Sequence, residues 1–141
     1  MKRLILLCVL LVASQAKVFK KCELSRVLKQ NGLAGYLGIT LPNWLCMAHR
    51  ESGYNTQTVR RLSDGSTNYG IFQINSRFWC DDGKTSGARN GCKISCSKLL
   101  DDDITDDIAC AKKIAREFRG LSGWLSWTIY CEGRRLFQYE C

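Results

Sequence analysis

The chain has little of what marks a modular or membrane-spanning protein. Its 141 residues include one proline and one histidine, and no internal repeat, low-complexity stretch or linker interrupts them. Beyond residue 16, no stretch is long and apolar enough to anchor the chain in a membrane. These absences exclude a repeat array and an integral membrane protein, and they favour one small domain.

The first sixteen residues have the composition of a signal peptide. A basic start precedes an apolar run from Leu4 to Val12, and small residues near Ala16 form a cleavage site. The apolar run is too short to span a membrane. We expect residues 1–16 to be a signal peptide and residues 17–141 to form one secreted, extracellular domain without a stable membrane anchor.

Cysteine, in contrast, is abundant: the chain has nine, of which Cys8 lies in the expected signal peptide. The remaining cysteines are Cys22, Cys46, Cys80, Cys92, Cys96, Cys110, Cys131 and Cys141. An even number in a short secreted chain predicts a disulfide framework, although spacing alone leaves many connectivities open. A zinc site is the alternative, because Cys92 and Cys96 have roughly ligand spacing, but a second ligand pair is missing.

Basic residues outnumber acidic ones by 21 to 13, which gives a formal net charge of +8. Several of the acids are gathered within residues 101–107, so the rest of the chain is strongly basic. A basic secreted surface favours polyanions such as bacterial wall polymers and speeds encounter with them; its alternative role is solubility alone. No recognition motif accompanies the charge, and we expect no nucleic-acid partner.

Hydrophobic spacing and turn signals predict helices and a small sheet. The expected helices cover residues 22–31, 42–52, 104–118 and 124–131. A hairpin or small antiparallel sheet is expected within residues 57–77, around the turn signal Asp64-Gly65. The expected core face of the third helix comprises Ile104, Ile108, Ala111, Ile114, Ala115 and Phe118. The predicted fold class is α+β, with a helical lobe and a small antiparallel β lobe flanking a cleft.

Two segments carry the most specific signal in the chain. Residues 50–56 read RESGYNT, and residues 64–77 read DGSTNYGIFQINSR. Together they look like the active-site cleft of the c-type lysozymes. The resemblance to the c-type lysozyme and α-lactalbumin family, and most of all to its calcium-binding lysozymes, extends over residues 17–141. One position departs from the family pattern, because Asn68 stands where the family normally has an aspartate.

That position matters because a glycosidase that retains the configuration of the sugar carbon uses two carboxyl groups, one a neutral acid and the other an ionised carboxylate. Lysozyme is the type case of this chemistry. The resemblance makes Glu51 the general acid. A helix-end position and apolar neighbours such as Trp124 should raise its pKa; the alternative is a solvated helix-end glutamate. Asn68 cannot ionise, so it can hydrogen-bond a sugar hydroxyl, or merely hold the strands together, but cannot act as a carboxylate.

The resemblance also assigns the cysteines and further cleft residues. It implies the disulfides Cys22–Cys141, Cys46–Cys131, Cys80–Cys96 and Cys92–Cys110. It implies sugar contacts by Gln73, Asn75, Phe78, Trp79, Glu117 and Trp124. Arg60 and Leu62 stand where many lysozymes have small polar residues, a departure that weakens the sugar site.

The aspartates within residues 101–107 form a second strong signal. Acidic tracts are usually disordered, but this tract lies between cysteines and precedes a helical pattern, so disorder is not expected. Another alternative is an acidic cap at the start of the following helix. Its ligand order is not that of an EF-hand. It resembles the calcium loop of α-lactalbumin and of calcium-binding lysozymes. The resemblance implies Ca²⁺ ligands from the side chains of Asp101, Asp106 and Asp107 and from the backbone carbonyls of Lys98 and Asp103.

The favoured function is a monomeric, calcium-binding lysozyme that hydrolyses the β-1,4 bonds between N-acetylmuramic acid and N-acetylglucosamine in bacterial peptidoglycan, with reduced activity because of Asn68. One alternative is an α-lactalbumin-like regulatory subunit of a galactosyltransferase, as in lactose synthase. The calcium loop and residues 136–141 favour that role, whereas Glu51 and the basic charge oppose it. A non-catalytic sugar-binding or membrane-disrupting relative is the third interpretation.

Overall fold

The computed structural model describes residues 17–141, so the expected signal peptide lies outside the described part of the chain. The α-helices are α2 (Lys21–Gln30), α3 (Leu41–Ser52), α4 (Thr105–Phe118) and α5 (Leu125–Tyr130). Short 3-10 helices are η1 (Tyr36–Gly38), η2 (Cys96–Leu99) and η3 (Phe137–Tyr139). The strands are β1 (Val59–Arg61), β2 (Thr67–Tyr69) and β3 (Ile74–Asn75). Each expected helix is present and shifted by at most one residue at either end, which is the usual uncertainty of helix boundaries.

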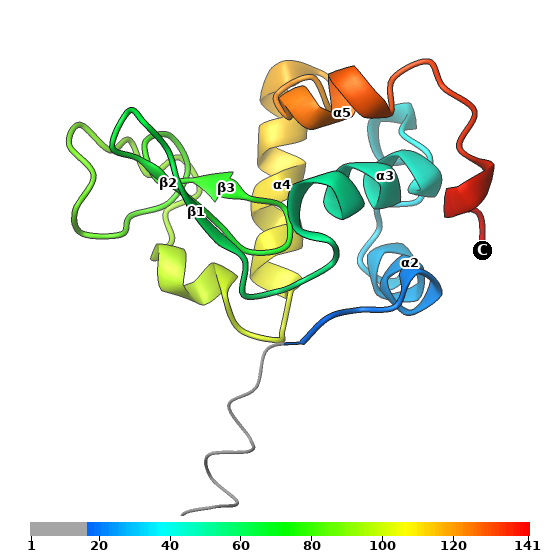
Figure 1. The fold of residues 1–141 in the computed structure, drawn as a ribbon, viewed down its shortest axis with the longest axis horizontal. Helices are drawn as coiled ribbons and strands as arrows, with labels where there is room; N and C mark the ends of the chain where they lie inside the picture. Colours follow the sequence, from blue (N-terminus) through cyan, green and yellow to red (C-terminus); the bar gives the residue numbers. More distant parts are fainter. Residues whose placement is uncertain (1–16) are drawn as a thin grey trace, which may run out of the picture.

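The two lobes that the sequence predicts lie on either side of α4 (Figure 1). The antiparallel sheet, ordered β1-β2-β3, is on one side, and α2, α3 and α5 are on the other. The predicted α+β fold, with a helical lobe and a small antiparallel sheet, is therefore confirmed. Among residues 17–141, no helix is both long and apolar enough to cross a membrane.

Local chemistry fixes both ends of α3. Pro42 occupies its first turn, where the missing N–H costs no hydrogen bond. At the other end Gly53 adopts a left-handed conformation with φ 60°, and its N–H donates to the carbonyl of His49 at 2.9 Å. The helix therefore ends at Ser52, which places Glu51 in its last turn.

The register of the sheet sets which side chains share a face. Arg60 pairs with Asn68 across β1 and β2, and Asn68 pairs with Asn75 across β2 and β3. Residues directly opposite one another in antiparallel strands point to the same side. Thr67 and Tyr69, which flank Asn68, are buried. Arg60, Asn68 and Asn75 consequently form a row across the other face of the sheet, toward the cleft.

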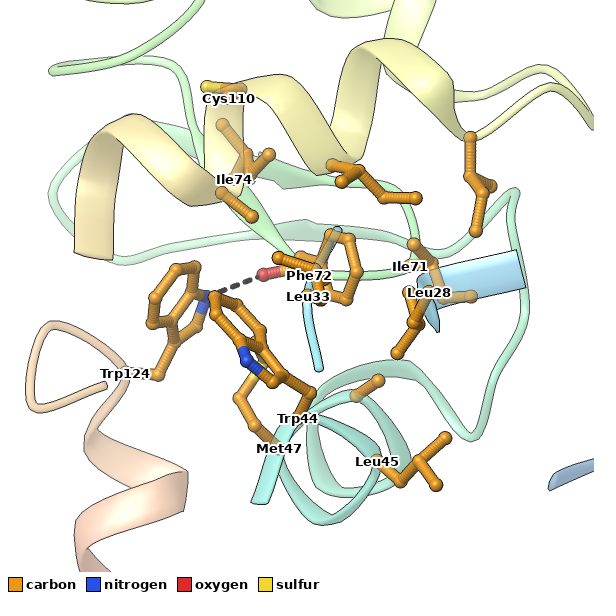
Figure 2. Close-up of a cluster of buried hydrophobic side chains, with 14 of the residues drawn as sticks. Leu28, Leu33, Trp44, Leu45, Met47, Ile71, Phe72, Ile74, Cys110 and Trp124 are labelled. Atoms are coloured by element: carbon orange, nitrogen blue, oxygen red, sulfur yellow. Dashed lines mark hydrogen bonds between the residues drawn. The ribbon is translucent and has the colours of Figure 1, made fainter. Parts of the chain in front are cut away.

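A buried core joins the lobes (Figure 2). The segment that contains Ile71 and Phe72 follows β2 and packs among residues of α2, α3 and α4, including Leu28 and Trp44. Trp124 closes the core next to the cleft: its Nε1 donates to the carbonyl of Phe72 at 2.8 Å, and its ring meets Trp44 edge-on with centroids 6.4 Å apart. These contacts tie the helical lobe to the turn between β2 and β3.

Four disulfides reinforce this arrangement, and they are the pairs that the resemblance implies. Cys22–Cys141 ties α2 to the last residue, and Cys46–Cys131 ties α3 to the end of α5. Cys80–Cys96 lies in the β lobe, and Cys92–Cys110 connects that lobe to α4. Crosslinks of this kind each stabilise a small domain by about 2–4 kcal/mol, mainly by restricting the unfolded chain.

One expectation about the core was wrong. Phe118, the last residue of α4, is 48% exposed, although the rest of its predicted face is buried. Its ring lies against Gly123, where an added Cβ would come within 2.8 Å of the Phe118 ring. Helical spacing predicted the direction of the side chain, but α4 ends at Phe118, and its last three residues, 116–118, are exposed.

Candidate active site

A cavity of about 480 Å³ lies between the two lobes and contains both residues of the expected catalytic pair. Glu51 reaches it from the end of α3, and Asn68 reaches it from the centre of the sheet. Residues from the sheet, from α3 and α4 and from the segment around α5 complete the lining: Arg50, Arg60, Leu62, Gln73, Ile74, Asn75, Trp79, Ile114, Gly123, Trp124, Leu125, Ser126, Ile129 and Tyr130. Two segments distant in sequence therefore meet at one cleft.

Glu51 is a half-buried carboxyl with one strong hydrogen bond. The hydroxyl of Ser126, at the start of α5, donates to Glu51 Oε1 at 2.6 Å. Burial raises the pKa of Glu51 above its usual value, and the hydrogen bond from Ser126 and the positive charge of Arg60 partly oppose that shift. A carboxyl that stays protonated to a higher pH is what a general acid requires.

Asn68 is held by a chain of hydrogen bonds within the sheet. Its Oδ1 accepts from Asn75 Nδ2 at 2.9 Å, and the same Nδ2 donates to Ser66 Oγ at 2.9 Å. Ser66 Oγ in turn donates to Asp64 Oδ1 at 2.6 Å. Because Asn75 occupies the oxygen of the Asn68 amide, the amide presents its Nδ2 group, a hydrogen-bond donor, as its other end.

Asp64 does not replace the missing carboxylate. Its side chain accepts from the backbone and hydroxyl of Ser66, and its other oxygen lies 3.5 Å from Arg77 Nε. The hydrogen bonds from Ser66 lower the pKa of Asp64, and Asp64 does not line the cavity. Among residues 17–141, Glu51 is therefore the one acidic residue that lines the cleft.

The structure divides the expected sugar contacts between two cavities. Gln73, Asn75, Trp79 and Trp124 line the cleft with Glu51, whereas Phe78 and Glu117 line a neighbouring cavity of about 450 Å³. Trp79 borders both cavities. The sequence resemblance placed these residues along one binding site, and the shared Trp79 wall shows that the two hollows adjoin.

Two of the cleft residues, Gln73 and Trp124, also hold backbone carbonyls next to the cleft. Buried Gln73 has a left-handed backbone with φ 51°, and its Nε2 donates to the carbonyls of Thr58 and Gly70, both at 3.0 Å. Trp124 holds the carbonyl of Phe72. Both side chains thus fix the turn between β2 and β3, which carries Asn75 into the cleft.

In the acidic loop, residues 101–107, some aspartate side chains accept hydrogen bonds from the protein and others do not. Asp102 Oδ1 accepts from Thr56 Oγ1 at 3.2 Å, which ties the loop to the segment before β1. Asp103 Oδ1 accepts from the backbone N–H and the hydroxyl of Thr105 at the start of α4. Within residues 17–141, Asp101 and Asp106 are exposed and form no ion pair.

Asp107 is the exception in this loop, because it is fully buried and both its carboxylate oxygens lack a hydrogen-bond partner. Burial, reinforced by the nearby charges of the other aspartates, raises its pKa to about 9. A Cβ on Gly70 would lie 2.8 Å from Asp107 Oδ2, so only glycine leaves room for this carboxylate. In the described part of the chain, the acidic side chains are not gathered into a three-ligand metal cluster.

Comparison with known proteins identifies the family. The model of the C-type lysozyme/alpha-lactalbumin family matches residues 17–141. The chain belongs to this family. Lysozyme C-2 of Mus musculus is 52% identical over 99% of this chain and 96% of its own length, and Lysozyme C II of Oncorhynchus mykiss is 50% identical over 97% and 95%. Lysozyme C of Saguinus oedipus is 52% identical over 99% and 96%.

This member of the C-type lysozyme/alpha-lactalbumin family has cleft residues that the sequence did not indicate. Ser126 is separated from Glu51 by 75 positions, and no motif marks it. The Arg50 guanidinium lies 4.7 Å from the centre of the Tyr130 ring, at the rim of the same cavity. Only packing of α5 against α3 brings these pairs together.

Proposed function

We propose that this protein is a secreted glycosidase of the lysozyme type, which cleaves the β-1,4 bonds between N-acetylmuramic acid and N-acetylglucosamine in bacterial peptidoglycan at a reduced rate. The observation that carries the proposal is a partly buried carboxyl, Glu51, with a raised pKa, in a cleft between the two lobes. The names of the relatives agree with this activity, and the basic chain suits an anionic cell wall.

In this mechanism, neutral Glu51 donates its proton to the glycosidic oxygen while the bond from that oxygen to the sugar carbon breaks. Ser126 donates to Oε1 of Glu51 and orients the carboxyl. The carbon that becomes cationic faces Asn68 rather than a carboxylate, so no covalent sugar ester forms there, and water must capture the cation. Loss of one preorganised electrostatic group typically costs roughly 10²–10³ in rate.

The test is hydrolysis of cell walls by turbidity and of a soluble chitooligosaccharide by product analysis. We expect slow turnover that Glu51→Gln abolishes, since glutamine has no proton to donate. Glu132→Gln is a matched control, because Glu132 is exposed and does not line the cleft. Saccharide binding without turnover in the unmutated protein would instead support the non-catalytic alternative. Stimulation of a galactosyltransferase would support the regulatory one.

We also propose that the acidic loop binds Ca²⁺ through the side chains of Asp101, Asp106 and Asp107 and the carbonyls of Lys98 and Asp103. The hydrogen bonds of the loop support this ligand set, because the side chains of Asp102 and Asp103 already accept hydrogen bonds from Thr56 and Thr105. Asp107 is buried without a partner, and a hard cation would satisfy its oxygens. Asp101 and Asp106 are exposed, and we expect them to turn inward on binding.

Calcium would act on stability rather than on the reaction, because the ion would neutralise mutually repelling carboxylates in the folded state only. Thermal melts with calcium and with excess chelator should differ by several degrees. Asp102→Asn is the matched control, since it removes one charge from the loop but no proposed ligand. Coincident melts of the unmutated protein would contradict the assignment.

A further inference from the structure

Arg60 is a cation in the cleft without an acidic partner. It lies in β1 and lines the same cavity as Glu51. Its positive charge acts on the Glu51 carboxyl. Within residues 17–141, the ion pairs are Lys17–Glu23 and Arg77–Asp64, so none involves Arg60. The guanidinium therefore keeps its hydrogen-bond donors for solvent or for a ligand.

The side chain directly opposite Arg60 in the sheet is also a donor. Arg60 and Asn68 are register partners, a relationship that places the two Cβ atoms about 5 Å apart on one face. Asn75 occupies the oxygen of the Asn68 amide, which leaves the Nδ2 group free. Arg60 and Asn68 thus project from opposite positions of neighbouring strands on the sheet face that lines the cleft, and both carry N–H donors.

An aspartate at position 68 would reverse this chemistry. It would accept from Asn75 as Asn68 does, and its second oxygen would face Arg60 across the sheet as an acceptor of opposite charge. Because asparagine stands there, Arg60 is not neutralised from within the protein. Leu62, which also lines the cleft, adds no polar group, and Arg50 is engaged with the Tyr130 ring.

We propose that Arg60 and Asn68 together bind a carboxylate carried by the saccharide in the cleft, so that this protein prefers acidic glycans to neutral ones. The inference rests on the proposed function, because it requires the cleft to be a saccharide site. A guanidinium recognises a carboxylate through paired N–H donors, and the Asn68 amide adds a third donor beside it.

Two kinds of sugar carry such a carboxylate. N-acetylmuramic acid without its peptide has a lactyl carboxylate on an ether arm, whereas a uronic acid has its carboxylate on the ring. The experiment separates them with three tetrasaccharide probes: neutral chitotetraose, an alternating muramic acid–N-acetylglucosamine chain with free lactyl groups, and an alternating glucuronate–N-acetylglucosamine chain. Titration calorimetry at physiological ionic strength gives each affinity, and mass spectrometry verifies that the probes remain intact.

We expect at least one acidic probe to bind roughly tenfold more tightly than chitotetraose, and the tighter of the two identifies the source of the carboxylate. Arg60→Gln should remove this preference. Arg61→Gln is the matched control and should keep the preference. This substitution removes the same charge from the next residue, but Arg61 pairs with Thr67 and does not line the cleft. Asn68→Asp should also remove the preference, since the new carboxylate would pair with Arg60.

Equal affinities for all three probes would overturn the inference and leave the cleft as a neutral saccharide site. Equal losses in Arg60→Gln and Arg61→Gln would also overturn it, because the preference would then come from general surface charge. If no probe binds, the proposed function fails together with the inference. Arg60 is exposed, and circular dichroism should show the same folded spectrum for both arginine variants.

Discussion

The cleft and the acidic loop each contain a carboxyl whose pKa is raised, but the surroundings of the two groups differ. Glu51 is half-buried, receives a hydrogen bond from Ser126 and lies near the cation Arg60. Asp107 is fully buried, has no hydrogen-bond partner and is surrounded by other aspartates. Burial is the first cause of both shifts, so a raised pKa by itself does not indicate catalysis.

The difference lies in what the protein arranges around each group. Glu51 opens into a cavity that a substrate can enter, and its neighbours oppose the shift in its pKa and so keep its proton transferable. Asp107 has no exposed surface, and the charges of the neighbouring aspartates add to the shift in its pKa. On the proposals above, the proton on Glu51 is transferred in the reaction, whereas a proton on Asp107 neutralises the charge that a bound cation would otherwise neutralise.

The largest expected effect comes from replacing each of the two carboxyls, Glu51 and Asp107, by its amide, which separates a catalytic role from a structural one. Glu51→Gln should abolish hydrolysis, a loss of at least about 10²-fold, with little change in melting temperature. Asp107→Asn should leave hydrolysis within a fewfold of the unmutated protein and raise the melting temperature in chelator at pH 7.5 by roughly 5 °C, because the unmutated protein must keep Asp107 protonated well above the usual pKa of an aspartate, a cost that asparagine does not carry. Oligosaccharide hydrolysis and calorimetric melts measure both. Loss of activity in both variants would erase the distinction.

The next effect concerns the missing carboxylate. Asn68→Asp should raise hydrolysis of a neutral chitooligosaccharide by at least about tenfold, because it restores a negative charge opposite the developing cation. Asn68→Ala provides the comparison, since it removes the amide without adding a charge. An unchanged rate in a folded Asn68→Asp protein would show that the cleft has lost more than one carboxylate, and Arg60 and Leu62 would then be the residues to change.

The acidic loop should give stability a specific pH dependence. The folded pKa of Asp107, about 9, lies above its usual value of 3.8, so its protonated form favours folding. That contribution is complete below pH about 4 and is lost as the pH rises toward 9. The melting temperature in calcium minus that in chelator should therefore grow between pH 5 and 8 by several degrees. A difference that is independent of pH, or one that persists in Asp107→Asn, would contradict this account.

The smallest expected effect concerns Ser126. Its hydrogen bond stabilises the ionised form of Glu51, so Ser126→Ala should raise the pKa of Glu51 further. The alkaline limb of the pH–activity profile should then move to higher pH, with a change of only a fewfold in maximal rate. Ser52→Ala is a control, because Ser52 hydroxyl donates to backbone carbonyls rather than to Glu51. A shift to lower pH would contradict the assigned hydrogen bond.

Much of the fold could be predicted from local sequence. Pro42 and Gly53 mark the two ends of α3, and the turn signal at Asp64-Gly65 lies between β1 and β2. The exposed position of Phe118 could not be predicted, because periodicity gives the direction of a side chain but not whether another element covers it. The 3-10 helices η1, η2 and η3 were also missed, since such short turns have little periodicity.

Some residues of the candidate site could be predicted from the sequence and others could not, because contacts between remote segments leave no local pattern. Glu51 and Asn68 stand out because their flanking segments resemble a known family, and the structure brings both to one cavity. Phe78 and Glu117 were expected at that site but line the adjoining hollow. Ser126 had no signal at all, because its contact with Glu51 depends on how α5 packs against α3.

The sequence alone determined the elements, the abundance of cysteine, the family and the loss of one carboxylate at position 68. These features are set by residue identity and by neighbours a few positions apart. Only the tertiary structure decided that Ser126 holds Glu51, that Asp107 is buried without a hydrogen-bond partner, and that Arg60 lies opposite Asn68 and, among residues 17–141, forms no ion pair. Burial and distance set the energy of a charge, and neither exists until remote segments pack together.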